Sequence, residues 1–208
     1  MSRPETKASS YGSESNGPVH EGALSASGRR FAIVAARFND FVVEKLVDGA
    51  RDALRRSGAA DEDVEIFRCP GAMEIPGLAR RVADGGDFDG IVCLGAVIRG
   101  ATPHFDLVVN EAARGVGTLT AEGKIAVAFG VLACDTIEQA LERAGTKAGN
   151  RGFDAAMVAV EMADLYARMA REQAAQAAST SGVAAVPPVP TVVPVEPTVA
   201  TDLPRRRK

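Results

Sequence analysis

Several residue types are scarce in this sequence of 208 residues, which has no tryptophan, three cysteines, two histidines and two tyrosines. The cysteines, Cys69, Cys93 and Cys134, lie far apart, and an odd number without CxxC spacing argues against a disulfide framework or a zinc site. We therefore expect reduced thiols, no bound metal and a cytoplasmic location. No apolar run approaches the roughly 18 residues of a membrane span, so we expect no membrane partner.

The sequence also lacks a strong charge of either sign. Its 24 Lys and Arg residues nearly balance 27 Asp and Glu residues, which gives a net charge of −3. No global basic field would attract nucleic acid, and the one dense basic run, 205–208, lies at the C-terminal end. The first residues are polar and rich in Ser and Gly, unlike the apolar core of a secretory signal. We expect no nucleic-acid partner and no secretion.

Composition divides the chain into three zones. Residues 1–17 carry almost no large apolar side chains and cannot become ordered by burial. Residues 18–170 alternate apolar runs with amphipathic ones and suffice for one buried domain. Residues 171–208 begin with an Ala/Gln-rich stretch, then carry a proline every few residues and end in RRRK. We expect a disordered N-terminal extension, one domain and a disordered tail.

The middle zone repeats a strand followed by a helix. A continuous apolar run predicts a strand at 31–36, and mainly apolar segments of strand length predict further strands at 64–69, 90–97 and 124–132. Apolar residues at helical spacing predict helices at 40–57, 74–82, 105–120, 135–144 and 152–170. Unbroken apolar strands that alternate with helices are typical of a parallel sheet covered on both faces. We predict a doubly wound α/β fold with four parallel strands in flavodoxin-like order.

One short segment, PVHEGAL at 18–24, has the pattern of a further strand. The SASG link that follows it is too short for a crossover to a parallel strand of the same sheet. We predict that this segment pairs with the sheet edge of a neighbouring subunit, which implies an oligomer.

Ligands of open parallel α/β sheets bind at the carboxyl ends of the strands, so the residues that follow each strand are candidates for a site. These residues are 37–40, 70–74, 98–104 and, at the fourth strand, 129–130 with 134–135. All four groups contain unusual residues for a plain turn, which predicts one common site.

The turn after the third strand is a candidate anion site. Gly100, Ala101 and Thr102 have little bulk, so their backbone N–H groups can approach an anion at the N-terminus of a helix that begins near His104. Thr102 adds a hydroxyl donor, and the preceding Arg99 adds a cation. The alternative is an ordinary helix start, with a Thr N-cap and a Pro at the first helical position. The residues alone leave both interpretations open.

Each remaining candidate has two interpretations. His104 can be structural, but beside an anion site an imidazole can move a proton near neutral pH, and we favour that role. Phe38 can stack on a planar heterocycle or pack against a neighbouring subunit. Asn39 and Asp40 are natural N-cap residues, which we favour for both. Glu74 suits the first turn of a helix and could also accept hydrogen bonds from sugar hydroxyls.

Five separated segments resemble the signature segments of lumazine synthases, in the same order. They are ARFNDF (36–41), PGAMEIP (70–76), LGAVIRGATPHFD (94–106), NEAARG (110–115) and IEQALERAGTKAGNRG (137–152). PVHEGAL also resembles the N-terminal strand of that family. The resemblance covers about residues 18–169 and neither tail. It implies a flavodoxin-like fold, pentamers with each active site between adjacent subunits, and no metal or organic cofactor.

The resemblance also implies a reaction of riboflavin biosynthesis on small-molecule substrates. The amine of 5-amino-6-(D-ribitylamino)uracil attacks the ketone of 3,4-dihydroxy-2-butanone 4-phosphate. Loss of phosphate and water then gives 6,7-dimethyl-8-ribityllumazine. The AGTKAGNRG loop resembles that of members forming 60-subunit icosahedral cages, which leaves open a cage with riboflavin synthase as its cargo.

Roles for individual residues follow from the resemblance as well. His104 is implied to be the proton donor and acceptor. The pyrimidine and its ribityl chain are implied to contact Phe38, Asn39, Ala72, Met73, Glu74, Ala96, Val97, Ile98 and Phe129. The phosphate is implied to contact Ala101, Thr102, Arg143, Arg99 and Arg151. Phe129 and Arg143 are implied to come from the neighbouring subunit.

The sequence departs from the family at four positions. Members often have an aromatic residue where Met73 stands, Thr where Ala96 stands, Lys where Arg151 stands and a hydroxyl residue where Cys134 stands. Main-chain roles of Met73 and Ala96 survive these changes, and Arg151 keeps the positive charge on a planar fork. None of the changes removes a catalytic group, so we expect an active enzyme.

Two other classes of function remain open. The chain could hold a lumazine or flavin without turnover, although His104, Thr102 and Arg143 together exceed what binding requires. It could also be mainly a shell protein, a role that can coexist with catalysis. The basic end of the tail is either an inert extension or a docking handle for cargo or acidic partners.

Overall fold

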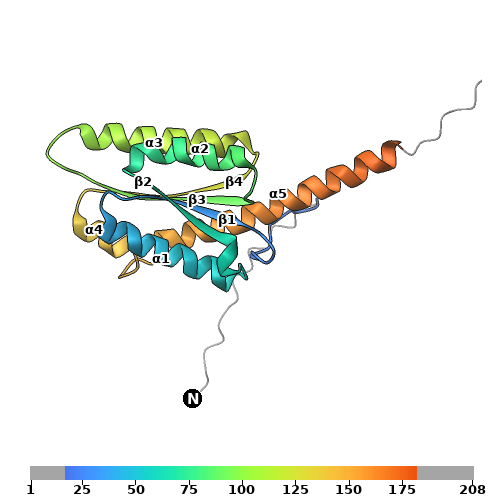
Figure 1. The fold of residues 1–208 in the computed structure, drawn as a ribbon, viewed down its shortest axis with the longest axis horizontal. Helices are drawn as coiled ribbons and strands as arrows, with labels where there is room; N and C mark the ends of the chain where they lie inside the picture. The colour runs from blue at the N-terminus through green and yellow to red at the C-terminus, as the bar shows by residue number, and fades with distance from the viewer. Residues whose placement is uncertain (1–16, 182–208) are drawn as a thin grey trace, which may run out of the picture.

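A four-stranded parallel sheet forms the centre of the molecule (Figure 1). The computed structural model describes residues 17–181. The strands are β1 (Phe31–Ala36), β2 (Val64–Cys69), β3 (Gly90–Ile98) and β4 (Ala126–Cys134). Their order is β2-β1-β3-β4 and every pairing is parallel, which confirms the flavodoxin-like arrangement predicted from the sequence.

Burial explains why these segments are strands. β1 is buried throughout, and β3 is buried from Gly90 to Ala96, because helices cover both faces of the two central strands. β2 and β4 are the edge strands, and they expose large side chains such as Ile66 and Phe129. Within residues 17–181 neither edge has a further strand beside it.

Helices lie on both faces of the sheet, as predicted (Figure 1). α2 (Ile75–Gly85) and α3 (His104–Glu122) cover one face. The other face is covered by α1 (Asp40–Arg56), α4 (Ile137–Arg143) and α5 (Arg151–Ser181). Two buried apolar clusters result, one on each side of the sheet. Short 3-10 turns at Asp61–Asp63 and Ala72–Glu74 stand before and after β2.

The first turn of α5 lies in close contact with α1. A Cβ atom at Gly152 would overlap the carbonyl oxygen of Leu46, so only glycine fits there. Asn150, just before α5, donates from Nδ2 to the carbonyl oxygen of Lys45 over 2.8 Å, and its Oδ1 accepts from the backbone N–H of Gly152 over 2.8 Å. These contacts fix the start of α5 against α1.

The segment that precedes β1 is attached to α5. Oδ2 of Asp164 accepts a hydrogen bond from the backbone N–H of Ala23 over 2.8 Å, and Oδ1 pairs with Arg29 over 2.7 Å. Asp164 is buried, and these bonds lower the pKa of its carboxyl group, the Ala23 N–H contributing most and Arg29 next. Gly22 lies so close to α5 that a Cβ atom there would overlap the Glu161 carbonyl oxygen.

Two predictions about the ends of the domain need correction or remain open. The last helix does not end near residue 170 but continues to Ser181, so the first part of the predicted disordered tail, 171–181, is helical. Its Ala, Gln and Glu residues are good helix formers, which explains why the helix continues while its side chains through residue 178 are exposed. The other predicted disordered segments, 1–16 and 182–208, lie outside the described residues.

The segment at 18–24 belongs to no strand within the described chain. Its pairing with a neighbouring subunit therefore stays a prediction. The strand predicted at 124–132 lies two residues further on, because β4 pairs with β3 in the register Gly90–Ala126 to Ile98–Cys134.

Candidate active site

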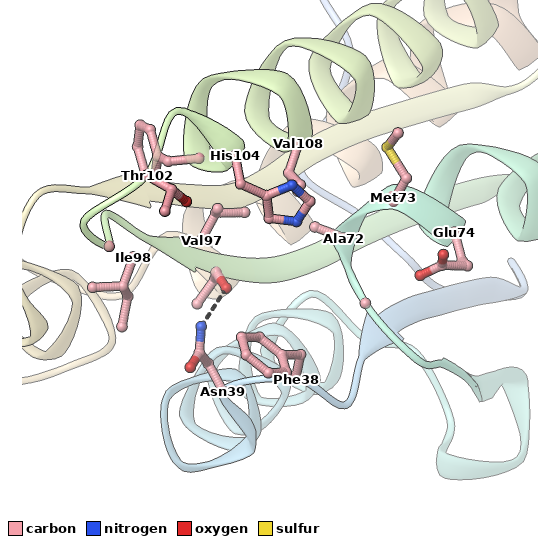
Figure 2. Close-up of a pocket in the computed structure, with 14 residues that line it drawn as sticks. Phe38, Asn39, Ala72, Met73, Glu74, Val97, Ile98, Thr102, His104 and Val108 are labelled. Carbon is pink, nitrogen blue, oxygen red and sulfur yellow. Dashed lines mark hydrogen bonds between the residues drawn. The ribbon is translucent and has the colours of Figure 1, made fainter.

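A cavity of about 510 Å³ opens at the carboxyl ends of β1 and β3. After β1 the chain crosses to β2 at one edge of the sheet, and after β3 it crosses to β4 at the other edge. In open α/β sheets, ligands bind at the strand ends where the chain diverges in this way. The cavity is within the size range of small-molecule sites. It is lined by Phe38, Asn39, Gly71, Ala72, Met73, Glu74, Ala96, Val97, Ile98, Gly100, Thr102, His104, Phe105 and Val108 (Figure 2).

The turn after β1 presents an aromatic ring to this cavity. Phe38 is 70% exposed, although a phenyl ring in a folded domain is usually covered. Its backbone is fixed, because its N–H donates to the carbonyl oxygen of Pro70 over 3.0 Å. Asn39 follows with φ of 60°, a left-handed conformation, and is the only non-glycine residue with positive φ among residues 17–181. The strand exit therefore holds an exposed ring on a constrained backbone.

The turn after β2 supplies a second wall of the cavity. Cys69 ends the strand, and burial followed by the nearby Glu74 carboxylate raises the pKa of its thiol. Ala72 is buried, whereas Met73 and Glu74 are exposed in the 3-10 turn just before α2. In Figure 2, Met73 and Glu74 lie on one side of His104, and Thr102 and Ile98 lie on the other. The cavity thus has a carboxylate end and a hydroxyl end.

The loop between β3 and α3 has the features of an anion site. Among the described residues, the backbone N–H groups of Gly100, Ala101 and Thr102 donate no hydrogen bond to protein. They precede the N-terminus of α3, where the helix dipole favours negative charge. Thr102 makes no side-chain capping bond, so the interpretation as a plain Thr N-cap is not supported: the capping position is Pro103.

The imidazole of His104 lies at the first residue of α3 and is exposed to the cavity (Figure 2). The ring of Phe38 lies on the opposite side of the same space (Figure 2). An imidazole, an exposed aromatic ring and a loop of unpaired N–H groups therefore border the same cavity. That combination can hold a planar group and an anion and move protons between them.

Arg99 is held by other residues at the edge of this loop. Its Nε donates to Asp135 over 2.7 Å, and both terminal nitrogens donate to Asp106 over 3.2 Å. The guanidinium carbon lies 4.0 Å from the centre of the Phe105 ring. The hydrogen bonds to Asp135 and then Asp106 raise the pKa of Arg99. Neither Arg99 nor Ala101 lines the cavity.

Three of the predicted site residues lie elsewhere in the same subunit. Phe129, Arg143 and Arg151 line a second cavity of about 300 Å³ beside β4. Phe129 is exposed, Arg151 pairs with Asp154 over 3.2 Å, and Arg143 donates to the carbonyl oxygen of Gln139 over 3.3 Å. The structure therefore places the predicted residues in two separate cavities, apart from Arg99 and Ala101, which line neither.

Two residues that line the main cavity, Phe105 and Val108, were not among the predicted site residues, whereas Gly71 and Gly100 belong to the predicted strand-end groups. Val108 lies on the apolar face of the predicted helix, and its spacing gave no reason to separate it from the core. Phe105 directly follows His104, and an aromatic residue at a helix start beside a predicted site was a usable signal.

Neither a metal centre nor a membrane span is built by the described residues. Between residues 17 and 181, no three His, Cys, Asp or Glu side chains gather as metal ligands would. In the same range, none of the helices combines the length and the apolar character needed to cross a bilayer.

The chain is similar to known proteins over nearly all of the region that forms the two cavities. A family model described as 6,7-dimethyl-8-ribityllumazine synthase matches residues 28–167. A relative of that name from Chlorobium phaeobacteroides is 56% identical over 146 residues, which cover 70% of this chain and 94% of the relative. One from Desulfatibacillum aliphaticivorans is 58% identical over 145 residues, covering 70% and 94%. One from Syntrophus aciditrophicus is 54% identical over 147 residues, covering 71% and 96%.

Proposed function

Since the chain belongs to the 6,7-dimethyl-8-ribityllumazine synthase family, we propose that the cavity at the carboxyl ends of β1 and β3 is its active site. The chain is an enzyme of riboflavin biosynthesis. It condenses 5-amino-6-(D-ribitylamino)uracil with 3,4-dihydroxy-2-butanone 4-phosphate to 6,7-dimethyl-8-ribityllumazine, releasing phosphate and water. The observation that carries the assignment of the cavity is that one space brings together Phe38, His104 and two residues of the loop with unpaired N–H groups, Gly100 and Thr102.

The pyrimidine end of the cavity is built from the exits of β1, β2 and β3. In the proposed complex the Phe38 ring stacks on the pyrimidine, and Glu74 with the main chain of Ala72 and Met73 holds the ribityl hydroxyls. The backbone of Val97 and Ile98 contacts the polar edge of the heterocycle. The carbonyl oxygen of Ala96 already accepts from Asn39, so we assign Asn39 to the support of the site.

The phosphate end is the loop before α3. The substrate phosphate binds the N–H groups of Ala101 and Thr102 and the Thr102 hydroxyl, at the positive end of the α3 dipole. The amine attacks the ketone and water leaves, which gives an imine. The carbon next to the imine carries an acidic proton. His104 takes that proton while the C–O bond to phosphate breaks, and the dianion leaves into the loop. The enol that remains takes up a proton at its end carbon and becomes a ketone. The ribityl-bearing amine attacks this ketone, and a second loss of water completes the lumazine ring.

Positioning supplies much of the rate in this scheme. The cavity holds the two reactants side by side, so the reaction between them becomes effectively unimolecular. The N–H groups of the loop stabilise the charge that develops on the leaving phosphate. A single imidazole adds a factor of the order of 10²–10⁴ by proton transfer.

We further propose that each active site is completed by an adjacent subunit in a pentamer. Phe129, Arg143 and Arg151 line an exposed cavity on β4 that shares no residue with the first. Arg143 of one subunit neutralises the phosphate bound by the loop of the next. Assembly of pentamers into a 60-subunit cage and riboflavin synthase as cargo are proposed on the resemblance of the 144–152 loop alone. A cytoplasmic location is supported by three free, buried cysteines.

Two experiments test these proposals. Mixing the purified chain with both substrates should produce lumazine absorbance, and no product would overturn the function. For the shared site, His104→Ala and Arg143→Ala variants are unfolded together and reassembled in equal amounts. Because about a quarter of all interfaces in the random mixture then combine an intact His104 with an intact Arg143, activity should return. Mixtures no more active than either variant alone would contradict a site shared between subunits.

A further inference from the structure

Arg99 connects three elements around the phosphate loop. It directly follows β3, and its backbone N–H donates to the carbonyl oxygen of Cys134 at the end of β4 over 2.9 Å. Its two terminal nitrogens form a two-pronged pair with Asp106 in the first turn of α3. Its Nε pairs with Asp135, the residue after β4. One side chain therefore ties the ends of β3 and β4 to the start of α3.

The loop that Arg99 encloses has few other attachments. Within the described chain, one backbone hydrogen bond outside the regular helix closes it, from the N–H of Asp106 to the carbonyl oxygen of Pro103 over 3.1 Å. Residues 100–104 are all exposed. The pair between Arg99 and Asp106 spans these residues and so fixes both the unpaired N–H groups and the helix turn that carries His104. The Phe105 ring, packed 4.0 Å from the guanidinium carbon, keeps that turn in place from the side facing the cavity.

The contacts also show why Arg99 is a poor direct ligand for phosphate. A guanidinium holds a phosphate best through a bidentate edge, and Asp106 already occupies such an edge here. Phe105 covers one face of the group, and Asp135 takes the Nε donor. Arg99 also offsets the charge of two carboxylates that would otherwise repel an anion at the neighbouring loop.

We propose that Arg99, through Asp106 and Asp135, is a positioning residue that holds the phosphate loop and the His104 turn in their working geometry. This inference rests on the proposed function of the site. It replaces the expectation that Arg99 binds the phosphate itself.

The Asp106→Asn variant separates the two roles, because they predict opposite signs. If Arg99 binds phosphate directly, removing a competing carboxylate frees the guanidinium and removes a negative charge, so the KM for the phosphate substrate falls. If Arg99 positions the loop, Asp106→Asn loosens it, and we expect kcat/KM for the phosphate substrate to fall at least about tenfold. The Kd of the pyrimidine substrate should stay within about twofold, since its contacts lie at the other end of the cavity.

Matched controls separate a specific effect on the loop from a general effect of the substitutions. Glu111→Gln removes an exposed carboxylate paired with Arg114 on the same helix and should leave kinetics unchanged. Arg99→Lys keeps the charge but not the two-pronged geometry and should resemble Asp106→Asn. The double variant Arg99→Ala/Asp106→Asn should be no slower than Arg99→Ala, because both remove the same contact.

The outcomes are distinct. An Asp106→Asn enzyme with unchanged or improved kcat/KM, beside an active wild type, overturns the positioning role alone. Additive losses in the double variant also overturn it. A wild-type chain that forms no lumazine overturns the proposed function, and the inference with it.

Discussion

Nδ2 of Asn39 donates a hydrogen bond to the carbonyl oxygen of Ala96 over 2.8 Å, joining the turn after β1 to β3 beneath the proposed pyrimidine position (Figure 2). Asn39 also has a left-handed backbone, φ 60°, and its carbonyl oxygen accepts from the N–H groups of Val42 and Val43 at the start of α1. Asparagine tolerates this conformation better than most residues. The residue therefore fixes the backbone that carries Phe38 in two ways, by conformation and by cross-link.

Substitutions of Asn39 separate these two contributions. Asn39→Gly keeps the left-handed backbone but loses the cross-link, whereas Asn39→Asp keeps the shape and points a carboxylate at the Ala96 carbonyl oxygen. We expect Asn39→Asp to weaken pyrimidine binding at least about tenfold, because its carboxylate repels the Ala96 carbonyl oxygen. Asn39→Gly should weaken binding less, because it only removes the cross-link. Calorimetric titration with the pyrimidine measures both. Equal affinity of Asn39→Asp and wild type would show that the cross-link does not support the site.

Replacing His104 should affect turnover and spare binding. His104→Gln keeps a polar side chain but cannot exchange a proton, so kcat should fall by about 10²–10⁴. The Kd of the pyrimidine should be nearly unchanged, because Phe38 and Glu74 remain. Single-turnover kinetics beside equilibrium titration measures the two effects separately. A variant with wild-type kcat would remove His104 from the mechanism.

The Asp164 carboxylate should stabilise the fold in a pH-dependent way. Its pKa is lowered in the folded chain, first by the Ala23 N–H and then by Arg29, so its contribution is present above the ordinary value of 3.8 and is lost as the pH falls through the lower folded value. Asp164→Asn should lower the free energy of unfolding by about 1–3 kcal/mol at about pH 7. The difference between variant and wild type should shrink below about pH 4.

Urea unfolding at both pH values measures this difference. Asp48→Asn is a suitable control, because its carboxylate is exposed and lies 3.8 Å from Lys45. It should change stability by less than about 0.5 kcal/mol. A difference for Asp164→Asn that stays constant down to about pH 3 would contradict a lowered pKa.

Two glycine substitutions in helices should have opposite signs. Gly152→Ala places a methyl group on the Leu46 carbonyl oxygen and should cost several kcal/mol or prevent folding, because α1 and α5 must separate. Gly117→Ala in α3 meets nothing within 4 Å and should stabilise the chain by about 0.5–1 kcal/mol through helix propensity. Thermal unfolding of the two variants beside wild type measures both. A Gly152→Ala chain as stable as wild type would contradict the α1–α5 contact.

Much of the fold was predictable because its two central strands are continuous apolar runs. β1 and β3 are central strands, so burial on both faces removes the polar alternation and leaves an unmistakable pattern. The flavodoxin-like order of the strands was predicted because that order is common for four strand–helix units, and the family resemblance implied the same order. The end of α5 was not predictable in this way, because residues 171–181 are helical without burying an apolar face.

The candidate site was predictable to the extent that it lies at strand ends. Phe38, Glu74, Thr102 and His104 each follow a predicted strand, and parallel strands bring their carboxyl ends to one edge. The environment of Arg99 was not predictable, because its partners Asp106 and Asp135 come from different loops whose side-chain directions depend on tertiary packing. From the sequence alone, a basic residue beside an anion-binding loop is expected to bind the ligand. The positioning role of Arg99 is inferred from its contacts with Asp106 and Asp135 in the structure.

The central claim is that one cavity binds both substrates and converts them. The most direct test incubates the purified full chain with the pyrimidine and an excess of the butanone phosphate, and measures lumazine and free phosphate in the same samples. We predict equal molar amounts of both products, many times the amount of protein, and a parallel loss of both in the His104→Gln variant. Binding of the pyrimidine without release of phosphate, or product limited to the amount of protein, would contradict the account.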